Sequence, residues 1–187
     1  ESTGVASGVI TGTVTSVHGE AIEGVTVTAR DLGRSAETGA DGTYTLDGVP
    51  VSSVLLTFTA EGFQTTNITV PRTFFDNSNH AVADVVMNNA DAVISGMVYD
   101  GDSDNGDSPL SGATVTLTFG SKSESVTTGE DGTYRFENMV VQDYAMSVTH
   151  SERLSVNKSI SADMFTEGQE GKMSVSLDIT MFSSALL

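Results

Sequence analysis

The sequence predicts an all-β protein made of two tandem seven-stranded β-sandwiches. The first observation is a six-residue segment that occurs twice, as Gly39–Tyr44 (GADGTY) and as Gly129–Tyr134 (GEDGTY). Because Gly tolerates positive φ and Asp binds its own turn backbone, each copy is typical of a tight turn leading into a strand. The second observation is the alternation of apolar and polar residues in short segments between such turns. Two copies in 187 residues indicate two domains, 1–89 and 90–187.

The first repeat shows seven alternating segments at intervals of roughly 8 to 12 residues, which is typical of a two-sheet sandwich. The predicted strands lie at about 8–17, 25–29, 35–38, 43–46, 53–60, 63–70 and 81–87. The residues predicted to face the core are Ile10, Gly12, Val14, Val25, Val27, Ala29, Tyr44, Leu46, Val54, Leu56 and Phe58.

The second repeat follows the same order, since Val93–Gly96 matches Val9–Gly12 and Leu110–Val115 matches Ile22–Val27. An insertion is expected in its first turn, where a hairpin tolerates it. A closing strand is predicted over 173–181. The other core-facing residues are predicted to be Val115, Leu117, Phe119, Tyr134, Phe136, Tyr144, Met146, Val148, Leu154, Val156 and Ile160. The short linker predicts a semi-rigid, end-to-end pair.

The net charge of −17 is spread over both halves, because 1–89 carry 3 basic and 10 acidic residues and 90–187 carry 5 and 15. Nucleic acid and anionic membrane surfaces would therefore meet repulsion along the whole chain. No apolar run approaches the roughly 20 residues of a membrane span, so no direct membrane insertion is expected. The absence of Cys excludes a disulfide framework. The start at Glu1, without Met, suggests that a targeting segment has been removed.

The motifs of both halves resemble the carboxypeptidase regulatory-like domain family. The similarity rests on Val/Ile-x-Gly-x-Val, then Leu/Ile-x-Gly-Ala/Val-x-Val, then Gly-x-Asp-Gly-x-Tyr, most clearly at 9–60 and 93–148. The resemblance implies a transthyretin-like (prealbumin-like, Ig-like) β-sandwich. It also implies a non-catalytic accessory module of a bacterial protein that is secreted or anchored at the cell surface or outer membrane, for example as a lipoprotein. Some related adhesin repeats carry a Lys-to-Asn isopeptide bond, which is not expected here because the predicted first strands, 8–17 and 92–99, contain no Lys.

The loop 71–80 carries Phe74 and Phe75 side by side, and alternation cannot bury both on one face. One interpretation is that one ring closes the end of the sandwich. The other is that the pair forms a contact surface for a partner. Together with Tyr99, these rings are the candidate contacts for a glycan or a protein partner, because sugar platforms need exposed flat aromatic rings.

The acidic loop after residue 99 is the candidate metal site. It offers the alternating carboxylates of Asp100, Asp102, Asp104 and Asp107, which could surround Ca²⁺ with several oxygens. The loop departs from the EF-hand pattern, since Asn105 stands where Gly belongs and Ser111 where a bidentate Glu belongs. The alternative is a solvated acidic hairpin loop. No cofactor besides this Ca²⁺ is expected.

No catalytic constellation can be found in the sequence, since His18, His80 and His150 show no spacing that suggests a shared metal or a triad. We therefore predict a monomeric, non-enzymatic module for adhesion, spacing or binding of a protein partner. The alternatives are a carbohydrate-binding module and the N-terminal part of a larger receptor or peptidase. Fold alone does not decide among them.

Overall fold

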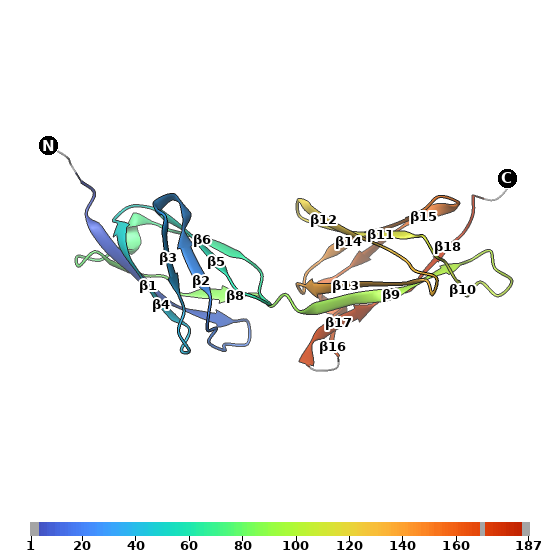
Figure 1. The fold of residues 1–187 in the computed structure, drawn as a ribbon, viewed down its shortest axis with the longest axis horizontal. Helices are drawn as coiled ribbons and strands as arrows, with labels where there is room; N and C mark the ends of the chain where they lie inside the picture. Colours follow the sequence, from blue (N-terminus) through green and yellow to red (C-terminus); the bar gives the residue numbers. More distant parts are fainter. Residues whose placement is uncertain (1–3, 169–170, 185–187) are drawn as a thin grey trace. The chain divides into compact units, whose positions relative to one another are not determined.

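The computed structural model describes residues 4–168 and 171–184 and divides the chain into two compact units, 1–90 and 91–187 (Figure 1). Both units are built from β-strands, with single turns of 3-10 helix in the loops that are described. Each unit has its own apolar core, formed between two sheets. The all-β, tandem-sandwich prediction is confirmed.

The described residues of unit 1 form eight strands and two 3-10 turns. They are β1 (Ser7–Ser16), β2 (Thr26–Ala29), η1 (Arg30–Leu32), β3 (Arg34–Glu37), β4 (Thr43–Pro50), β5 (Val54–Thr59), β6 (Thr66–Val70), η2 (Arg72–Phe74), β7 (His80–Val82) and β8 (Val85–Met87). One sheet places β1 between antiparallel β4 and parallel β7 and β8. The other sheet has the order β3-β2-β5-β6.

The alternation in β1 places Ile10 and Val14 inside and leaves the threonines between them on the outer face. Every residue predicted to face the core of unit 1 is buried, including Tyr44, which is 3 % exposed. Burial of these rows against the opposite sheet supplies the main stabilising free energy of the unit.

The last strand of unit 1 is interrupted, where the alternation predicted one strand over 81–87. β7 and β8 each pair with β1 in parallel, and Ala83 and Asp84 lie between them. The interruption has a physical cause, because the Ala83 carbonyl oxygen accepts a hydrogen bond from the Tyr44 hydroxyl at 2.7 Å instead of continuing a regular ladder. The Ala83 carbonyl thus binds the buried tyrosine, and the Asp84 side chain binds the backbone of β1.

Unit 2 repeats this arrangement, and its described residues form ten strands and a 3-10 turn after β15. They are β9 (Ala92–Asp100), β10 (Ser108–Pro109), β11 (Thr114–Phe119), β12 (Lys122–Thr127), β13 (Thr133–Met139), β14 (Tyr144–His150), β15 (Arg153–Ile160), η3 (Ala162–Met164), β16 (Thr166–Glu167), β17 (Met173–Ser176) and β18 (Ile179–Met181). β9 is the counterpart of β1 and pairs with β13, β10, β17 and β18. The second sheet has the order β12-β11-β14-β15.

One predicted core residue of unit 2 lies at the surface, since Leu154 is 54 % exposed. Val156 packs against the core and Ile160 is buried in it, as predicted. The register of the β14–β15 pair shifts between Val148 and His150, close to Leu154, so the alternation does not extend to the start of β15. The predicted closing strand is divided into β17 and β18 at Leu177 and Asp178, as in unit 1.

Candidate functional site

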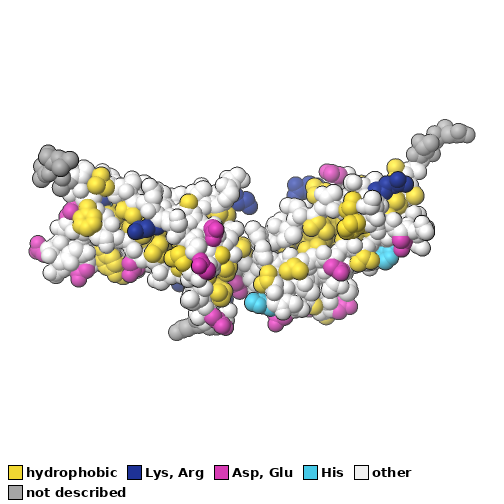
Figure 2. Space-filling model, turned by 180° about the vertical axis from the view of Figure 1, so that it is seen from behind, with side chains coloured by type: hydrophobic (Ala, Val, Ile, Leu, Met, Phe, Trp, Pro, Cys, Tyr) yellow, Lys and Arg dark blue, Asp and Glu magenta, His cyan; other side chains and the backbone are white. Residues whose placement is uncertain are grey.

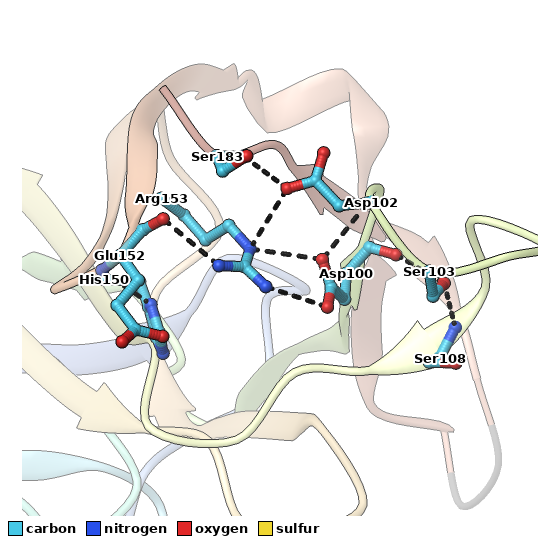
Figure 3. Close-up of polar contacts among 8 residues, drawn as sticks. All are labelled: Asp100, Asp102, Ser103, Ser108, His150, Glu152, Arg153 and Ser183. Atoms are coloured by element: carbon cyan, nitrogen blue, oxygen red, sulfur yellow. Dashed lines mark hydrogen bonds and ion pairs between the residues drawn. The ribbon is translucent and has the colours of Figure 1, made fainter. Parts of the chain in front are cut away.

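The acidic loop of unit 2 begins at an ion pair between Asp100, at the end of β9, and Arg153, at the start of β15 (Figure 3). Arg153 Nη2 donates to Asp100 Oδ2 at 2.8 Å and Nε donates to Oδ1 at 3.1 Å. Both side chains are largely covered, at 15 % and 22 % exposure. The bidentate geometry fixes the guanidinium plane, and its hydrogen bonds hold the pKa of Asp100 below the usual value.

Asp102 joins the same arrangement from the other side of Arg153. Its Oδ2 accepts a hydrogen bond from the Ser183 backbone N–H at 2.7 Å and lies 3.7 Å from Arg153 Nε. The contact with Ser183 is the main reason that the pKa of Asp102 is lowered. Arg153 therefore ties the start of the loop to β15, while Asp102 ties it to the segment after β18 (Figure 3).

Gly101 lets the loop pass close to this segment. A Cβ on Gly101 would lie 2.4 Å from the ring of Phe182, while the Gly101 N–H donates to the Met181 carbonyl oxygen at 2.8 Å. Beyond it, Ser103 Oγ donates to the Asp100 carbonyl oxygen at 2.7 Å. The base of the loop is thus fixed by its own backbone and by neighbouring segments.

The four predicted metal ligands are not gathered around one point. Asp100 and Asp102 are engaged with Arg153, and Asp104 and Asp107 are exposed in the loop. Among residues 4–168 and 171–184, no group of three or more His, Cys, Asp or Glu side chains is placed to hold a metal ion. A cation at Asp100 would have to compete with the guanidinium, so Ca²⁺ binding stays a prediction that needs its own test.

The two adjacent phenylalanines of unit 1 have different environments. Phe74, in η2, is 54 % exposed, whereas Phe75 packs against the core and would meet a Cβ placed on Gly8 at 2.9 Å. Tyr99, on β9, is partly exposed and its hydroxyl donates to Met97 Sδ at 3.3 Å. Of the three candidate contact rings, Phe74 offers the most open surface.

A polar contact set that links the first strand of each sandwich to its divided last strand was not visible in the repeat motifs alone. In unit 1 the Tyr44 hydroxyl donates to the Ala83 carbonyl oxygen, and the Thr13 N–H donates to Asp84 Oδ1 at 2.9 Å. A Cβ on Gly12 would lie 2.0 Å from the same Ala83 oxygen, which explains why the first strand carries Gly there. Burial, and secondarily the charge of Asp84, raises the pKa of Tyr44, so the hydroxyl stays a donor.

Unit 2 has the same contact set. The Tyr134 hydroxyl donates to the Leu177 carbonyl oxygen, and the Met97 N–H donates to Asp178 Oδ1 at 2.9 Å. A Cβ on Gly96 would lie 2.0 Å from the Leu177 oxygen. We call this Tyr, Gly and Asp arrangement the tyrosine lock. The signal that could have revealed it is the shared pattern Asp-Val/Ile-x-Met, which begins at Asp84 and at Asp178.

Three further titratable side chains, Asp41, Asp131 and His80, also make contacts within local structure. Asp41 Oδ1 accepts from the N–H and the hydroxyl of Thr43, and Asp131 does the same with Thr133, which lowers the pKa of both carboxyl groups. His80 Nε2 lies 2.6 Å from the hydroxyl of Thr11. These contacts stabilise turns and strands.

Comparison with known proteins agrees with this geometry. The sequence profile of the carboxypeptidase regulatory-like domain matches residues 9–87 and 93–178. The chain belongs to the carboxypeptidase regulatory-like domain family. It contains two copies of that domain, and the resemblance read from the motifs is confirmed. No curated protein matches the chain at a significant level.

Solved structures with the same fold include two pilins. A streptococcal ancillary pilin is 14 % identical, with a TM-score of 0.53, over 96 % of this chain and 63 % of the pilin. GBS52, the minor pilin of Streptococcus agalactiae, is 11 % identical, with a TM-score of 0.50, over 96 % of this chain and 98 % of the pilin. At these identities the likeness concerns the fold.

Proposed function

We propose that this chain is a non-catalytic module of an exported bacterial surface protein, where it spaces another part or binds a protein partner. The observation that carries the proposal is that the buried tyrosine side chains form hydrogen bonds with the backbone. The hydroxyls of Tyr44 and Tyr134 donate to backbone carbonyls of their own unit. Catalytic groups are typically titratable side chains with shifted pKa values that face a cleft. Here the groups with shifted pKa values take part in tyrosine locks, turns and an ion pair, and Tyr144 donates its hydroxyl to the Val140 carbonyl oxygen.

The outer surface supports the same proposal. Figure 2 shows acidic side chains scattered over the visible face, few basic ones, and a large uncharged area. On β11 the outward residues are threonines, Thr114, Thr116 and Thr118, opposite further Ser and Thr residues on β12. No helix in the described part of the chain is long and apolar enough to cross a membrane. A surface of this kind favours a partner that is neutral or positively charged.

The pilin fold is further support for a surface role. Pilins are the proteins named in the two matches, and this chain covers 63 % of the first and 98 % of the second. Both matches cover 96 % of this chain and therefore extend over both of its units. We infer that the two sandwiches act as consecutive domains of a surface protein, and that contacts are made by their strand-end loops.

The acidic loop of unit 2 is the contact surface we propose first. Its base is held by Arg153, while Asp104 and Asp107 are exposed. A fixed base lowers the entropy lost when a partner orders the loop tip. Exposed carboxylates attract Lys or Arg on a partner, and that attraction weakens with salt.

The test combines location and binding. Proteases added to intact producing cells are expected to cleave the chain, and the purified chain is expected to capture a surface protein in a salt-sensitive manner. Capture should fall for Asp104→Asn with Asp107→Asn and persist for the control Glu23→Gln with Asp31→Asn, which removes the same number of exposed charges from unit 1. Retention inside the cell, or equal capture by both variants, would contradict the proposal.

A carbohydrate-binding role is the second candidate, favoured by the 54 % exposure of Phe74. An exposed ring can stack on a sugar face. Glycan-array binding that is lost in Phe74→Ala and kept in Tyr99→Phe would support it. If the wild-type chain bound no glycan on the array, the carbohydrate-binding role would be wrong.

A further inference from the structure

Two Asn residues occupy the same register position in the two repeats, and each starts an Asn-x-Ser/Thr tripeptide. They are Asn67-Ile68-Thr69 in β6 and Asn157-Lys158-Ser159 in β15. No other Asn in the sequence is followed by this pattern. The tripeptide is the acceptor sequence for N-linked glycosylation in exported proteins.

The strand pairing establishes that the two positions are equivalent. Val27 pairs with Phe58 in unit 1, as Val115 pairs with Val148 in unit 2. One residue earlier on the same strands, Thr57 pairs with Asn67, as Ser147 pairs with Asn157. The acceptor tripeptide is therefore found twice at one structural position, although the two units differ at many others.

Both tripeptides are open to a modifying enzyme. Asn67, Thr69, Asn157 and Ser159 are all exposed. Because side chains two residues apart share a face of a strand, the Asn and the hydroxyl residue of each tripeptide lie on the same outer side. The Thr57 hydroxyl donates to Asn67 Oδ1 at 2.7 Å, a contact that does not use Nδ2, the atom that would carry the sugar.

The two strands also have room beside them. β6 and β15 each form the last strand of a four-stranded sheet. In unit 2, Asn157 and Ser159 line a shallow hollow of about 470 Å³ on the outer face, together with Thr118 and Ser147. A first sugar residue could lie over this hydroxyl-rich surface.

An edge strand needs protection against pairing with another chain, usually by charged residues or Pro. The stretch 62–70, which contains β6, has no charged residue. A glycan on Asn67 would cover this edge and supply the missing protection.

We propose that Asn67 and Asn157 are N-glycosylation sites, one in each repeat. The donor is a sugar linked to a polyprenyl phosphate. The bond from the anomeric carbon to the phosphate oxygen breaks, and the phosphate leaves with the electron pair. A bond from the anomeric carbon to Asn Nδ2 forms as one Nδ2 proton passes to a base of the transferase. The proposal rests on the export that the proposed function includes.

The test uses the full chain, purified from the surface of the cells that naturally produce it, with intact-mass and glycopeptide mass spectrometry. We expect glycan mass on Asn67 and on Asn157. Thr69→Val and Ser159→Ala should each remove one glycan. The matched controls Thr69→Ser and Ser159→Thr, which keep the acceptor pattern, should retain both. All four changes leave the Thr57–Asn67 contact intact, so a purely structural role of the Asn would not produce this difference.

The outcomes are distinguishable. A surface-located chain with the mass of the bare polypeptide would overturn the glycosylation proposal alone. So would modification of only one Asn, or sugar that persists in the Thr69→Val, Ser159→Ala double variant. A chain that stays inside the cell would overturn the proposed function and this inference together.

Discussion

The first hairpins of the two units start from equivalent strands and end differently. In unit 1, β1 ends at Ser16, whose hydroxyl oxygen accepts from the N–H groups of His18 and Glu20 in a short turn. In unit 2 the equivalent residue is Asp100, which leads into a longer loop and pairs with Arg153. The strand cores stay the same, because both are fixed by a tyrosine lock, while the strand ends are free to diverge.

The same contrast holds where each unit meets its last segment. Gln64 N–H donates to the Asn88 carbonyl oxygen in unit 1, and Leu154 N–H donates to the Phe182 carbonyl oxygen in unit 2, both at 2.8 Å. The residue just before is Phe63, packed against the core, in one unit and Arg153, in an ion pair, in the other. The same backbone contact thus occurs in both units, next to a buried apolar side chain in one and an ion pair in the other. Unit 2 uses the electrostatic one to hold its acidic loop.

The largest expected effect comes from the glycines of the tyrosine locks. Gly12→Ala should destabilise unit 1 and Gly96→Ala unit 2, because each Cβ would lie 2.0 Å from a backbone carbonyl oxygen. Overpacking costs roughly 1–3 kcal/mol, and loss of the buried tyrosine hydrogen bond adds roughly 1–3 kcal/mol. Hydrogen exchange with mass spectrometry would assign the loss to one unit. Gly39→Ala and Gly129→Ala, at positions without a close backbone contact, are the controls and should change stability by less than about 0.5 kcal/mol.

Removing the lock hydroxyls should have a smaller effect that is alike in the two units. Tyr44→Phe removes the donor to the buried Ala83 carbonyl oxygen, and Tyr134→Phe removes the donor to the partly buried Leu177 carbonyl oxygen. Each change should cost about 1–3 kcal/mol in the free energy of unfolding. Urea denaturation measures this. Tyr99→Phe, which removes a partly exposed hydroxyl, is the matched control. Losses no larger than the control's would show that the lock hydroxyls add little to stability.

Most strands, core rows and turns of the two sandwiches could be predicted from the sequence, because alternation and turn residues are local signals. The rows through Ile10 and Val115 and the turns at Asp41 and Asp131 are found as predicted. The divided last strands could not be predicted, since the cause is a hydroxyl that is distant in sequence: Tyr44 donates to Ala83 from 39 residues away. Alternation also failed at Leu154, where the register of an edge strand shifts.

The candidate site was harder to predict for the same reason. The acidic loop was visible as a local run of carboxylates, whereas its partner Arg153 is 53 residues away. No spacing rule connects an Arg after one hairpin to an Asp at the end of another strand. The equivalent position of the two acceptor tripeptides likewise becomes visible only when the strand register is known.

The ion pair of unit 2 should make its stability more dependent on acid than that of unit 1. The pKa values of Asp100 and Asp102 are lowered from 3.8 by their contacts with Arg153 and Ser183 respectively. A lowered folded-state pKa stabilises the fold above the unfolded pKa, and this contribution is lost as pH falls through the folded value. Arg153→Gln should therefore lower the Tm of unit 2 at pH 7. Between pH 7 and a pH below about 4, the Tm of the variant should fall by less than the Tm of the wild type.

The exposed pair Arg34 and Asp47, 3.9 Å apart, supplies the control, since Arg34→Gln should change the free energy of unfolding by about 0.5 kcal/mol or less. Equal shifts in both variants would contradict a special role of Arg153.

The smallest expected effect is that of Ca²⁺, because the guanidinium of Arg153 already occupies Asp100. If the loop binds the ion, Ca²⁺ must displace Arg153, so the wild-type Tm should rise little with added Ca²⁺ and the Arg153→Gln Tm should rise more. Ligand binding stabilises by RT ln(1 + [L]/Kd), so a tenfold gain in affinity adds about 1.4 kcal/mol when the ion is in excess. Asp104→Asn in the Arg153→Gln background should reduce that rise if the exposed carboxylate is a ligand. A Tm that is unchanged by Ca²⁺ and by a chelator in both backgrounds would remove the metal prediction and leave the loop as a surface for protein contacts.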